Sequence, residues 1–222
     1  MLILYHHPLN TLSRTVRLAL KEKHLEFELH EEPFWLRRPE FMALNPAGEV
    51  PVLVEDGRPL AIGGWAVCEY LEEVHIEVPL MGQGVSGRAE TRRLINWFEG
   101  KFAHEVSAFL SGEKLLKRVA SNATPDSRAI RAGLENVNVH LEYIAWLTER
   151  RSWLAGDILT YADLTAGAHI SLLDYSGDVP WKDHPLAKEW YVRLKSRPSF
   201  RPLLADVLPG IPPAPTYADL DF

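Results

Sequence analysis

The chain has 222 residues, of which 46% are hydrophobic and 24% are charged, a balance typical of globular domains with a substantial core. Its formal net charge of −6 gives no general attraction to nucleic acid, and its single cysteine excludes an internal disulfide. The sequence has neither an apolar run of about 18 residues nor a signal-peptide pattern, so we expect a cytoplasmic protein without membrane insertion.

The N-terminal part of the chain predicts a β-α-β unit. Residues 2–5 form a short apolar run typical of a buried strand, and a polar loop follows it. Apolar residues at helical spacing then predict a helix capped by Thr11 or Ser13, and residues 25–29 predict a second strand. If the two strands are parallel, the connection between them is right-handed.

The next structured stretch, residues 45–73, predicts a hairpin. The β-branched run from Val50 to Val54 ends at a Glu-Asp-Gly turn, and residues 60–62 are the expected returning strand. Pro51 lies inside the first run, where a proline removes a donor of the sheet ladder unless it begins the strand or follows a cis bond. We predict a cis bond between Val50 and Pro51.

A helix is expected after this hairpin. Gly63 and Gly64 interrupt the second strand, and apolar residues from Trp65 to Val74 are spaced as on one face of a helix. Cys68 lies on that apolar side, which favours a packed thiol over a reactive one.

A lapse of apolar periodicity at residues 76–86, where glycine and proline concentrate, predicts a domain boundary. Beyond it the pattern is helical. The predicted helices run from Arg88 to about Leu116, from Thr124-Pro125 onward, from 185 to 195 and from 199 to about 207. The predicted domains are residues 1–80 and 87–208, followed by an extended, proline-rich tail at 209–222.

One helix start in the second domain has a recognisable cap. Thr160 and Asp163 have the spacing of a capping box with aspartate in place of glutamate. The helix that follows is apolar enough to lie at the centre of the helical domain, so this motif indicates folding and no chemistry.

Two motifs of the first domain resemble the glutathione transferase family. One is the run S-R-x-V-R-L-A-L-x-E-K-x-L-x-F from Ser13, and the other is the V-P-x-L strand from Val50. The resemblance covers nearly the whole chain, and the capping box at Thr160 matches a structural signature of the family's second domain. It implies an α/β plus all-α architecture, with an N-terminal thioredoxin-like domain and a C-terminal helical bundle. Because proteins of this family often form homodimers, a homodimer is implied as well.

By this resemblance, Val50, Pro51, Gly63 and Gly64 define a degenerate glutathione pocket. In the family, the cis-proline strand presents backbone groups to the cysteinyl part of glutathione, while an acidic residue and a serine at the next helix start hold its γ-glutamyl end. Here that pair is Gly63-Gly64. Two charge-assisted bonds worth roughly 1.5–3 kcal/mol each are missing. Their loss should weaken glutathione binding by about two to four powers of ten. We therefore expect no tightly bound cofactor, glutathione included.

The usual activating residue is also absent. Catalytic transferases use a tyrosine, serine or cysteine after the first strand to activate the sulfur of glutathione, and the spacing from Ser13-Arg14 places the serine or cysteine position at Asn10. An amide donates a hydrogen bond but is no nucleophile, and Tyr5 falls too early for the tyrosine version. Ser13 is a fallback donor, or simply a residue that bonds the helix backbone. We expect no catalytic residue, with Asn10 and Ser13 as vestigial candidates.

Two other stretches have the composition of interaction surfaces. Trp35 and Arg38 lie in a segment that mixes aromatic side chains with arginines, residue types enriched in interface hot spots. The alternative is that its aromatic rings pack inward under a loop. The tail ends in alternating acidic and apolar residues that dock either on their own domain or on another protein, namely Asp219, Leu220, Asp221 and Phe222.

Other chemistries have no support in the sequence. The histidines are scattered, without HExxH or paired-cysteine spacing, so we predict no metal site. Phosphate-loop and GxSxG motifs do not occur, which argues against nucleotide-dependent and hydrolase chemistry.

Two functional hypotheses follow. The first is a non-catalytic, glutathione-transferase-like protein that binds a macromolecule. The substituted pocket, the Trp35 segment and the A-D-L-D-F ending resemble the bacterial division proteins of this superfamily that bind filaments of the tubulin homologue FtsZ. That resemblance implies a dimer that binds FtsZ polymers, alters their curvature and supports constriction at the division site. The second hypothesis is a glutathione transferase or thiol-dependent isomerase with an atypical glutathione site, in which Ser13 or Asn10 donates to the thiolate.

Overall fold

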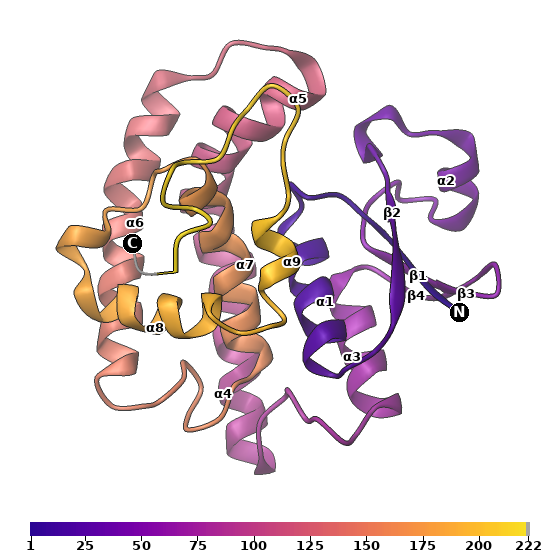
Figure 1. The fold of residues 1–222 in the computed structure, drawn as a ribbon, viewed down its shortest axis with the longest axis horizontal. Coiled ribbons are helices and arrows are strands. Elements are labelled where there is room, and N and C mark those ends of the chain that lie inside the picture. The colour runs from indigo at the N-terminus through magenta and orange to yellow at the C-terminus, as the bar shows by residue number, and fades with distance from the viewer. Residues whose placement is uncertain (221–222) are drawn as a thin grey trace. The chain divides into compact units, whose positions relative to one another are not determined.

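The computed structural model describes residues 1–220, and the chain divides into two compact units, Met1–Leu80 and Met81–Phe222 (Figure 1). The first unit holds a four-stranded sheet of order β2-β1-β3-β4. Strand β2 is parallel to β1, whereas β3 is antiparallel to both of its neighbours. The elements of this unit are β1 (Leu2–His6), α1 (Thr11–Glu22), β2 (Phe27–Glu31), η1 (Phe34–Leu36), α2 (Pro39–Leu44), β3 (Val52–Glu55), β4 (Arg58–Ile62) and α3 (Gly64–Val74).

The predicted thioredoxin-like sheet is confirmed, and its two faces follow from the alternation of side chains along each strand. Val52 and Val54 pack with Phe41 of α2 on one face, and Ile3 and Tyr5 of β1 join this cluster. Helices α1 and α3 pack against each other beside the sheet (Figure 1). Cys68 of α3 is fully buried, as predicted.

The predicted start of the second strand is wrong by two residues because helix α1 closes with a long turn. His24 adopts a left-handed conformation with φ 57°, and the N–H of Leu25 donates to the carbonyl of Leu20 at 2.9 Å. This is the bonding pattern of a Schellman motif, which terminates a helix and redirects the chain. Strand β2 therefore begins at Phe27.

The second unit is helical, as predicted. Helix α7 is buried along its whole length, and α6 packs along η2, a π-helical segment that continues directly from α4. The elements of this unit are α4 (Gly84–Asn96), η2 (Trp97–Leu116), α5 (Lys117–Ser121), α6 (Ser127–Thr148), α7 (Tyr161–Tyr175), η3 (Trp181–Asp183), α8 (Pro185–Lys195) and α9 (Arg201–Leu204).

Several predicted helix ends differ from the observed ones. The first long helix is continuous from Gly84 through α5, beyond both predicted ends. The second does not begin at Thr124-Pro125, because Asp126 is its N-cap and accepts from the N–H of Arg128 at 2.8 Å. The last helix is short, ending at Leu204.

The predicted capping box at the start of α7 is confirmed. The Oδ2 atom of Asp163 accepts from the N–H of Thr160 at 3.0 Å, and the Thr160 hydroxyl accepts from the N–H of Ala162. The Oδ1 atom accepts from the N–H of Leu154 at 2.8 Å and from Trp190 Nε1 at 3.0 Å. Asp163 therefore ties the preceding loop and α8 to the central helix.

A buried histidine joins η2 to α6. Trp97 Nε1 donates to Nδ1 of His140 at 3.1 Å, so the ring proton of the neutral histidine is on Nε2, which lies 3.2 Å from Glu105 Oε2. Burial lowers the pKa of His140 below its ordinary value, against the opposing effect of Glu105. Protonation would remove the acceptor that Trp97 uses.

This geometry predicts a pH dependence of stability. Because the unfolded chain protonates His140 at a higher pH than the native fold does, the free energy of unfolding should fall as the pH drops below about 6.5. The substitution His140→Gln should make this fall shallower, measured by urea unfolding at several pH values. His104→Gln, at an exposed histidine of η2, is the matched control and should leave it unchanged. Equal pH dependence in the His140→Gln variant and the parent would contradict the assignment.

Candidate functional site

The two vestigial catalytic candidates lie at the start of α1, where both are engaged in structural bonds. Thr11 or Ser13 was the predicted helix cap, and this prediction is wrong. The cap is Asn10, whose Oδ1 accepts from the N–H of Ser13 at 2.7 Å. The Ser13 side chain is fully buried, and its Oγ accepts from the N–H of His7 at 3.4 Å. Its hydroxyl therefore holds the loop after β1 against α1.

The cis bond predicted between Val50 and Pro51 is confirmed. The carbonyl of Pro51 accepts from the N–H of Gly63 at 3.0 Å, so the structure brings the cis-proline turn directly against the start of α3. All four residues of the predicted degenerate pocket are thus neighbours within the first unit.

The two glycines of this pocket differ in what a side chain would meet. Gly63 has φ 89°, a conformation that side-chain-bearing residues rarely adopt, although the space around it is open. Gly64 is the first residue of α3, and a Cβ there would lie 2.6 Å from Cδ2 and 2.8 Å from Cβ of Leu12. Leu12 therefore occupies the space that a serine side chain would need.

A direct attempt to rebuild the clamp should fail for this reason. We expect Gly64→Ser to lower the free energy of unfolding by about 1–3 kcal/mol, the usual effect of overpacking, and to leave glutathione binding no tighter. Urea unfolding and calorimetric titration measure the two effects. The double variant Leu12→Ala with Gly64→Ser is the control and should recover part of the stability, because it removes Cγ and Cδ2 of Leu12 and leaves only its Cβ in the way. A Gly64→Ser variant as stable as the parent would refute this assignment of Leu12.

Trp35 lies beside the end of β1 in a cluster of rings. Its ring centroid is 4.8 Å from that of His7 and 5.2 Å from that of Phe34, in edge-on arrangements. Nδ1 of His7 accepts from the N–H of Leu9 at 3.1 Å, which leaves the ring proton on Nε2, 3.5 Å from Glu31 Oε1. Trp35 remains half-buried, so part of its ring is available at the surface.

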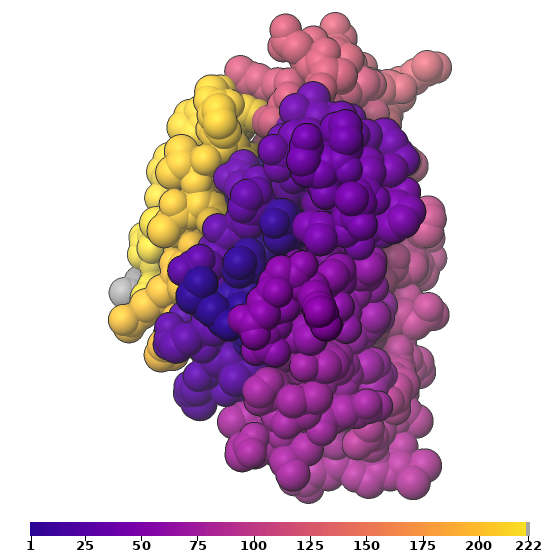
Figure 2. All heavy atoms as spheres, turned by 90° about the vertical axis from the view of Figure 1, so that its right-hand side faces the viewer, coloured from indigo at the N-terminus to yellow at the C-terminus, as the bar shows by residue number. Residues whose placement is uncertain are grey.

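Arg38 has a structural partner that the sequence did not reveal. Its Nε donates to Oε1 of Glu32 at 3.1 Å, and its Nη2 donates to Oε2 of the same carboxylate. The Glu32 side chain is fully buried, and hydrogen bonding and charge from Glu32 raise the pKa of Arg38 above its ordinary value. The segment that carries Trp35 and Arg38 forms part of the surface of this unit, seen among the violet atoms of Figure 2. A substitution of Arg38 alone would therefore also leave a buried carboxylate without its cation.

The tail packs on its own helical unit as far as Tyr217, which is fully buried. Its hydroxyl donates to the carbonyl of Leu203 at 2.8 Å, and Lys195 Nζ donates to the carbonyl of Thr216 at 3.1 Å. Asp219 then lies exposed and Leu220 half-buried, whereas the last two predicted contact residues, Asp221 and Phe222, lie outside the described residues.

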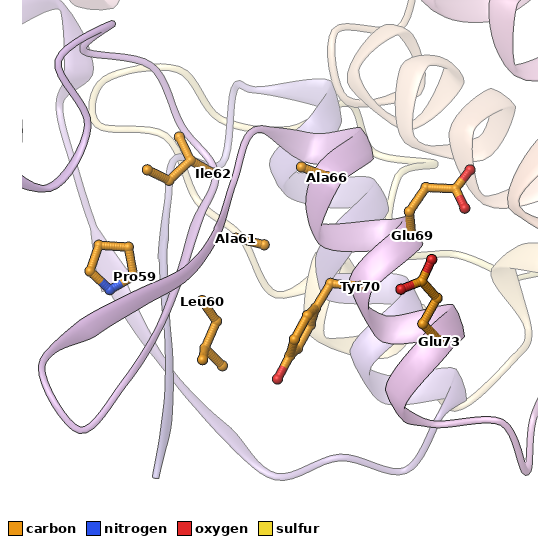
Figure 3. A pocket seen from close by; sticks show the side chains of 8 residues that line it. All are labelled: Pro59, Leu60, Ala61, Ile62, Ala66, Glu69, Tyr70 and Glu73. Carbon is orange, nitrogen blue, oxygen red and sulfur yellow. The ribbon is translucent and has the colours of Figure 1, made fainter.

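The first unit also has a surface groove of about 520 Å³ between β4 and α3 (Figure 3). Leu60 and Ile62 line its strand side, and Tyr70 extends from α3 toward them. Glu69 and Glu73 place carboxylates along the same helix, so the groove is apolar with an acidic rim.

Two features are absent from the part of the chain that the structure describes, a metal-binding cluster and a membrane-spanning helix. Across residues 1–220, no cluster of histidine, cysteine and acidic side chains is suited to holding a metal ion. Within the same range, no helix has the length and apolar character needed to cross a membrane.

Comparison with known proteins identifies the class. A family model of the glutathione S-transferase N-terminal domain matches residues 11–74. The chain belongs to the glutathione S-transferase superfamily, which confirms the resemblance carried by the Ser13 and Val50 motifs. It is similar to FtsZ-localized protein A of Caulobacter vibrioides, with 50% identity over 222 residues that cover 99% of this chain and 97% of that protein.

Solved structures agree with this placement. A glutathione S-transferase of Rhodospirillum rubrum F11 has a TM-score of 0.98 and 59% identity, with 100% of both chains covered. FzlA of C. crescentus has a TM-score of 0.95 and 49% identity, with 100% of this chain and 99% of that one covered.

Sequence reasoning missed two residues that shape the candidate site. Leu12 blocks the position of residue 64, but residues 12 and 64 carry no local pattern that pairs them. For Glu32 the sequence contains a weak indication of an ion pair, because this glutamate lies in a segment with arginines. Its complete burial is visible only in the tertiary structure.

Proposed function

We propose that this protein is a non-catalytic member of the superfamily that binds FtsZ filaments in the cytoplasm and regulates constriction at the bacterial division site. The observation that carries the proposal is the 50% identity, over 99% of this chain, to a protein named for its localisation with FtsZ. The alignment covers nearly the whole chain, and its identity exceeds the 27% shared with glutathione S-transferase F13 of Arabidopsis thaliana.

The degenerate pocket supports a role other than glutathione chemistry. Gly63 and Gly64 provide no side chains, and Leu12 fills the space beside Gly64. Asn10 and Ser13 are both engaged in holding the start of α1. A thiol substrate would therefore meet a pocket without the polar groups that grip and activate it.

The candidate contact surfaces for FtsZ are the Trp35 segment and the end of the tail. Trp35 is a partly exposed aromatic residue of the kind that anchors interfaces, and Arg38 is held in place beside it by Glu32. Asp219 and Leu220, with Asp221 and Phe222 after them in the sequence, supply an acidic and apolar peptide.

Co-sedimentation with polymerised FtsZ tests the proposal. The intact protein should pellet with the polymers, while Trp35→Ala and deletion of residues 219–222 should each reduce the bound fraction several-fold. Trp146→Ala is the matched control, because Trp146 is an exposed tryptophan of α6 in the other unit and should have no effect. Failure of the intact protein to pellet with FtsZ would overturn the division role.

A second experiment tests the alternative hypothesis, a glutathione transferase with an atypical glutathione site. Calorimetric titration should give no saturable glutathione signal below about millimolar concentration, since two charge-assisted bonds are missing. Clear saturation together with turnover of a standard electrophile would instead support a transferase.

We also propose a homodimer, in which a second copy covers the groove between β4 and α3. Its apolar floor and acidic rim match an exposed surface of α4 that carries Val85 and Arg88, so two copies are complementary in character and charge. Light scattering should give twice the monomer mass, and Ile62→Asp should convert the protein to monomers. Val207→Asp, at an exposed valine of the other unit, should leave the mass unchanged. A monomeric parent protein would contradict the proposal.

A further inference from the structure

We propose that a groove between α6 and the start of α8 is a second binding site, which takes an arginine-containing peptide from a partner other than FtsZ. This inference goes beyond the proposed function and does not depend on it. The groove has a volume of about 300 Å³, and all of its lining residues belong to the helical unit. Figure 1 shows α8 beside α6, and the two helices pack against each other.

Helix α6 supplies an aromatic ring between two carboxylates. Glu142, Trp146 and Glu149 line the groove, and their spacing of four and three residues places them on one face at the end of the helix. Trp146 is 50% exposed, although tryptophan is a residue type that is highly buried on average. Exposed tryptophan is enriched at binding hot spots, so this ring is the expected anchor of the site.

The protein itself shows which chemistry the Trp146 ring attracts. The guanidinium carbon of Arg150 lies 4.8 Å from the centroid of the ring, a cation–π contact, and Nη1 of Arg150 donates to the carbonyl of Trp146 at 2.9 Å. The ring of Tyr143 is nearly parallel to that of Trp146, with centroids 6.1 Å apart. These neighbours hold the tryptophan in place, so little order has to be gained when a ligand binds.

The start of α8 forms the opposite wall of the groove. His184 is the N-cap residue of α8, and its Nε2 donates to Oδ1 of Asn138 on α6 at 2.8 Å. This bond ties the two walls together, so the groove is already formed without a ligand. Leu186 is 37% exposed and adds an apolar surface, while Asp183 adds a third carboxylate.

The charges of the groove define its ligand. Arg150 pairs with Glu149 at 3.1 Å, whereas within residues 1–220 no ion pair or hydrogen bond involves the carboxylates of Glu142 and Asp183. The groove therefore carries excess negative charge beside an exposed ring. An arginine side chain complements both features, because its planar head pairs with carboxylates and its aliphatic stem packs on aromatic surface. Charge complementarity thus favours a peptide in which arginine alternates with apolar residues.

Fluorescence anisotropy with a labelled Leu-Arg-Leu-Arg-Leu peptide tests the proposal. The parent protein should bind this probe saturably, and the affinity should fall as salt is added. We expect about tenfold weaker binding of Leu-Gln-Leu-Gln-Leu, which lacks the cations, and of Gly-Arg-Gly-Arg-Gly, which lacks the apolar side chains. Equal binding of the glycine peptide would show that charge alone attracts the probe to an acidic protein, and it would overturn the proposed site.

Substitutions at the groove locate the binding. Glu142→Gln and Trp146→Ala should each weaken binding of the leucine–arginine probe by about five- to tenfold. Glu135→Gln, at an exposed glutamate of α6 that does not line the groove, and Trp35→Ala in the first unit are the matched controls and should have no effect. All four variants should unfold at nearly the same urea concentration as the parent, because the residues are at least partly exposed.

The remaining outcomes separate this site from the surfaces proposed for FtsZ. Trp146→Ala should lose the probe and still pellet with FtsZ polymers, whereas Trp35→Ala should show the reverse. Loss of both activities in Trp146→Ala would assign the groove to FtsZ and overturn the second partner. A parent that does not bind the probe, or one whose binding is unchanged in Glu142→Gln and Trp146→Ala, would overturn the site itself. If Trp146→Ala halves the mass measured by light scattering, a second copy fills the groove, which also contradicts the proposal.

Discussion

Replacing Lys195 with methionine is expected to lower the free energy of unfolding by about 3–5 kcal/mol, measured by urea or thermal unfolding. Lys195 Nζ is fully buried and lies 3.1 Å from Oδ2 of Asp174, whose side chain is 2% exposed. Methionine preserves most of the volume of lysine but leaves Asp174 as a buried carboxylate without its cation. Lys195 also bonds the carbonyl of Thr216, so the same change loosens the end of the tail.

A double substitution separates charge from packing in this region. Asp174→Asn in the Lys195→Met background removes the uncompensated charge, keeps an oxygen that accepts from Trp181 Nε1 and turns an amide donor toward the hydroxyl of Tyr191, which can accept, so it should restore a large part of the stability. Lys182→Met, at an exposed lysine of η3, is the matched control and should change stability little. A Lys195→Met variant close to the parent in stability would show that the buried pair contributes little.

The substitution Asp163→Ala is expected to cost about 3–5 kcal/mol of unfolding free energy, since it orphans several buried donors at about 1–3 kcal/mol each, incompletely additive. The donors are the N–H groups of Leu154 and Thr160 and Nε1 of Trp190. Burial raises the pKa of the Asp163 carboxyl, and these hydrogen bonds oppose that rise by stabilising its charge. Loss of the carboxylate should therefore release the loop before α7 and the contact with α8 together.

Two further variants test how much of this loss of stability depends on the carboxylate of Asp163. Asp163→Asn keeps an oxygen for Leu154 and Trp190 but turns a donor toward Thr160, so its stability should lie between those of the parent and Asp163→Ala. Asp157→Ala, at an exposed aspartate of the same loop, should be nearly neutral. Hydrogen exchange should place the loss of protection at the start of α7 first. Equal stability of Asp163→Ala and Asp157→Ala would refute the role given to the capping box.

Most of the fold could be predicted because its signals are local. Alternating β-branched residues indicated the strands, and helical spacing of apolar residues indicated α1, α3 and the helical unit. The errors lie at element ends, where a cap or a turn decides. Asn10 instead of Thr11 caps α1, and the left-handed His24 delays β2, because a side-chain oxygen or a single backbone angle outweighs hydrophobic periodicity there.

The candidate site was predicted in part. Gly63 and Gly64 are visible in the sequence as missing side chains, and the cis bond before Pro51 followed from a proline inside a strand pattern. The consequence of Gly64 was not visible, because it depends on Leu12 of another helix. Arg38 was predicted as a contact residue, but its bond to the buried Glu32 gives it a structural role as well.

The sequence by itself determined the family, the division into a thioredoxin-like and a helical part, and the presence of Gly63, Gly64 and Asn10 on which the prediction of a degenerate glutathione pocket rests, since each depends on which residues are present and on their local spacing. Only the tertiary structure decided that Leu12 fills the place beside Gly64, that Glu32 holds Arg38, and that Tyr175 and Lys195 anchor the tail. These contacts join residues on different elements, and packing and burial, which no local pattern encodes, bring them together.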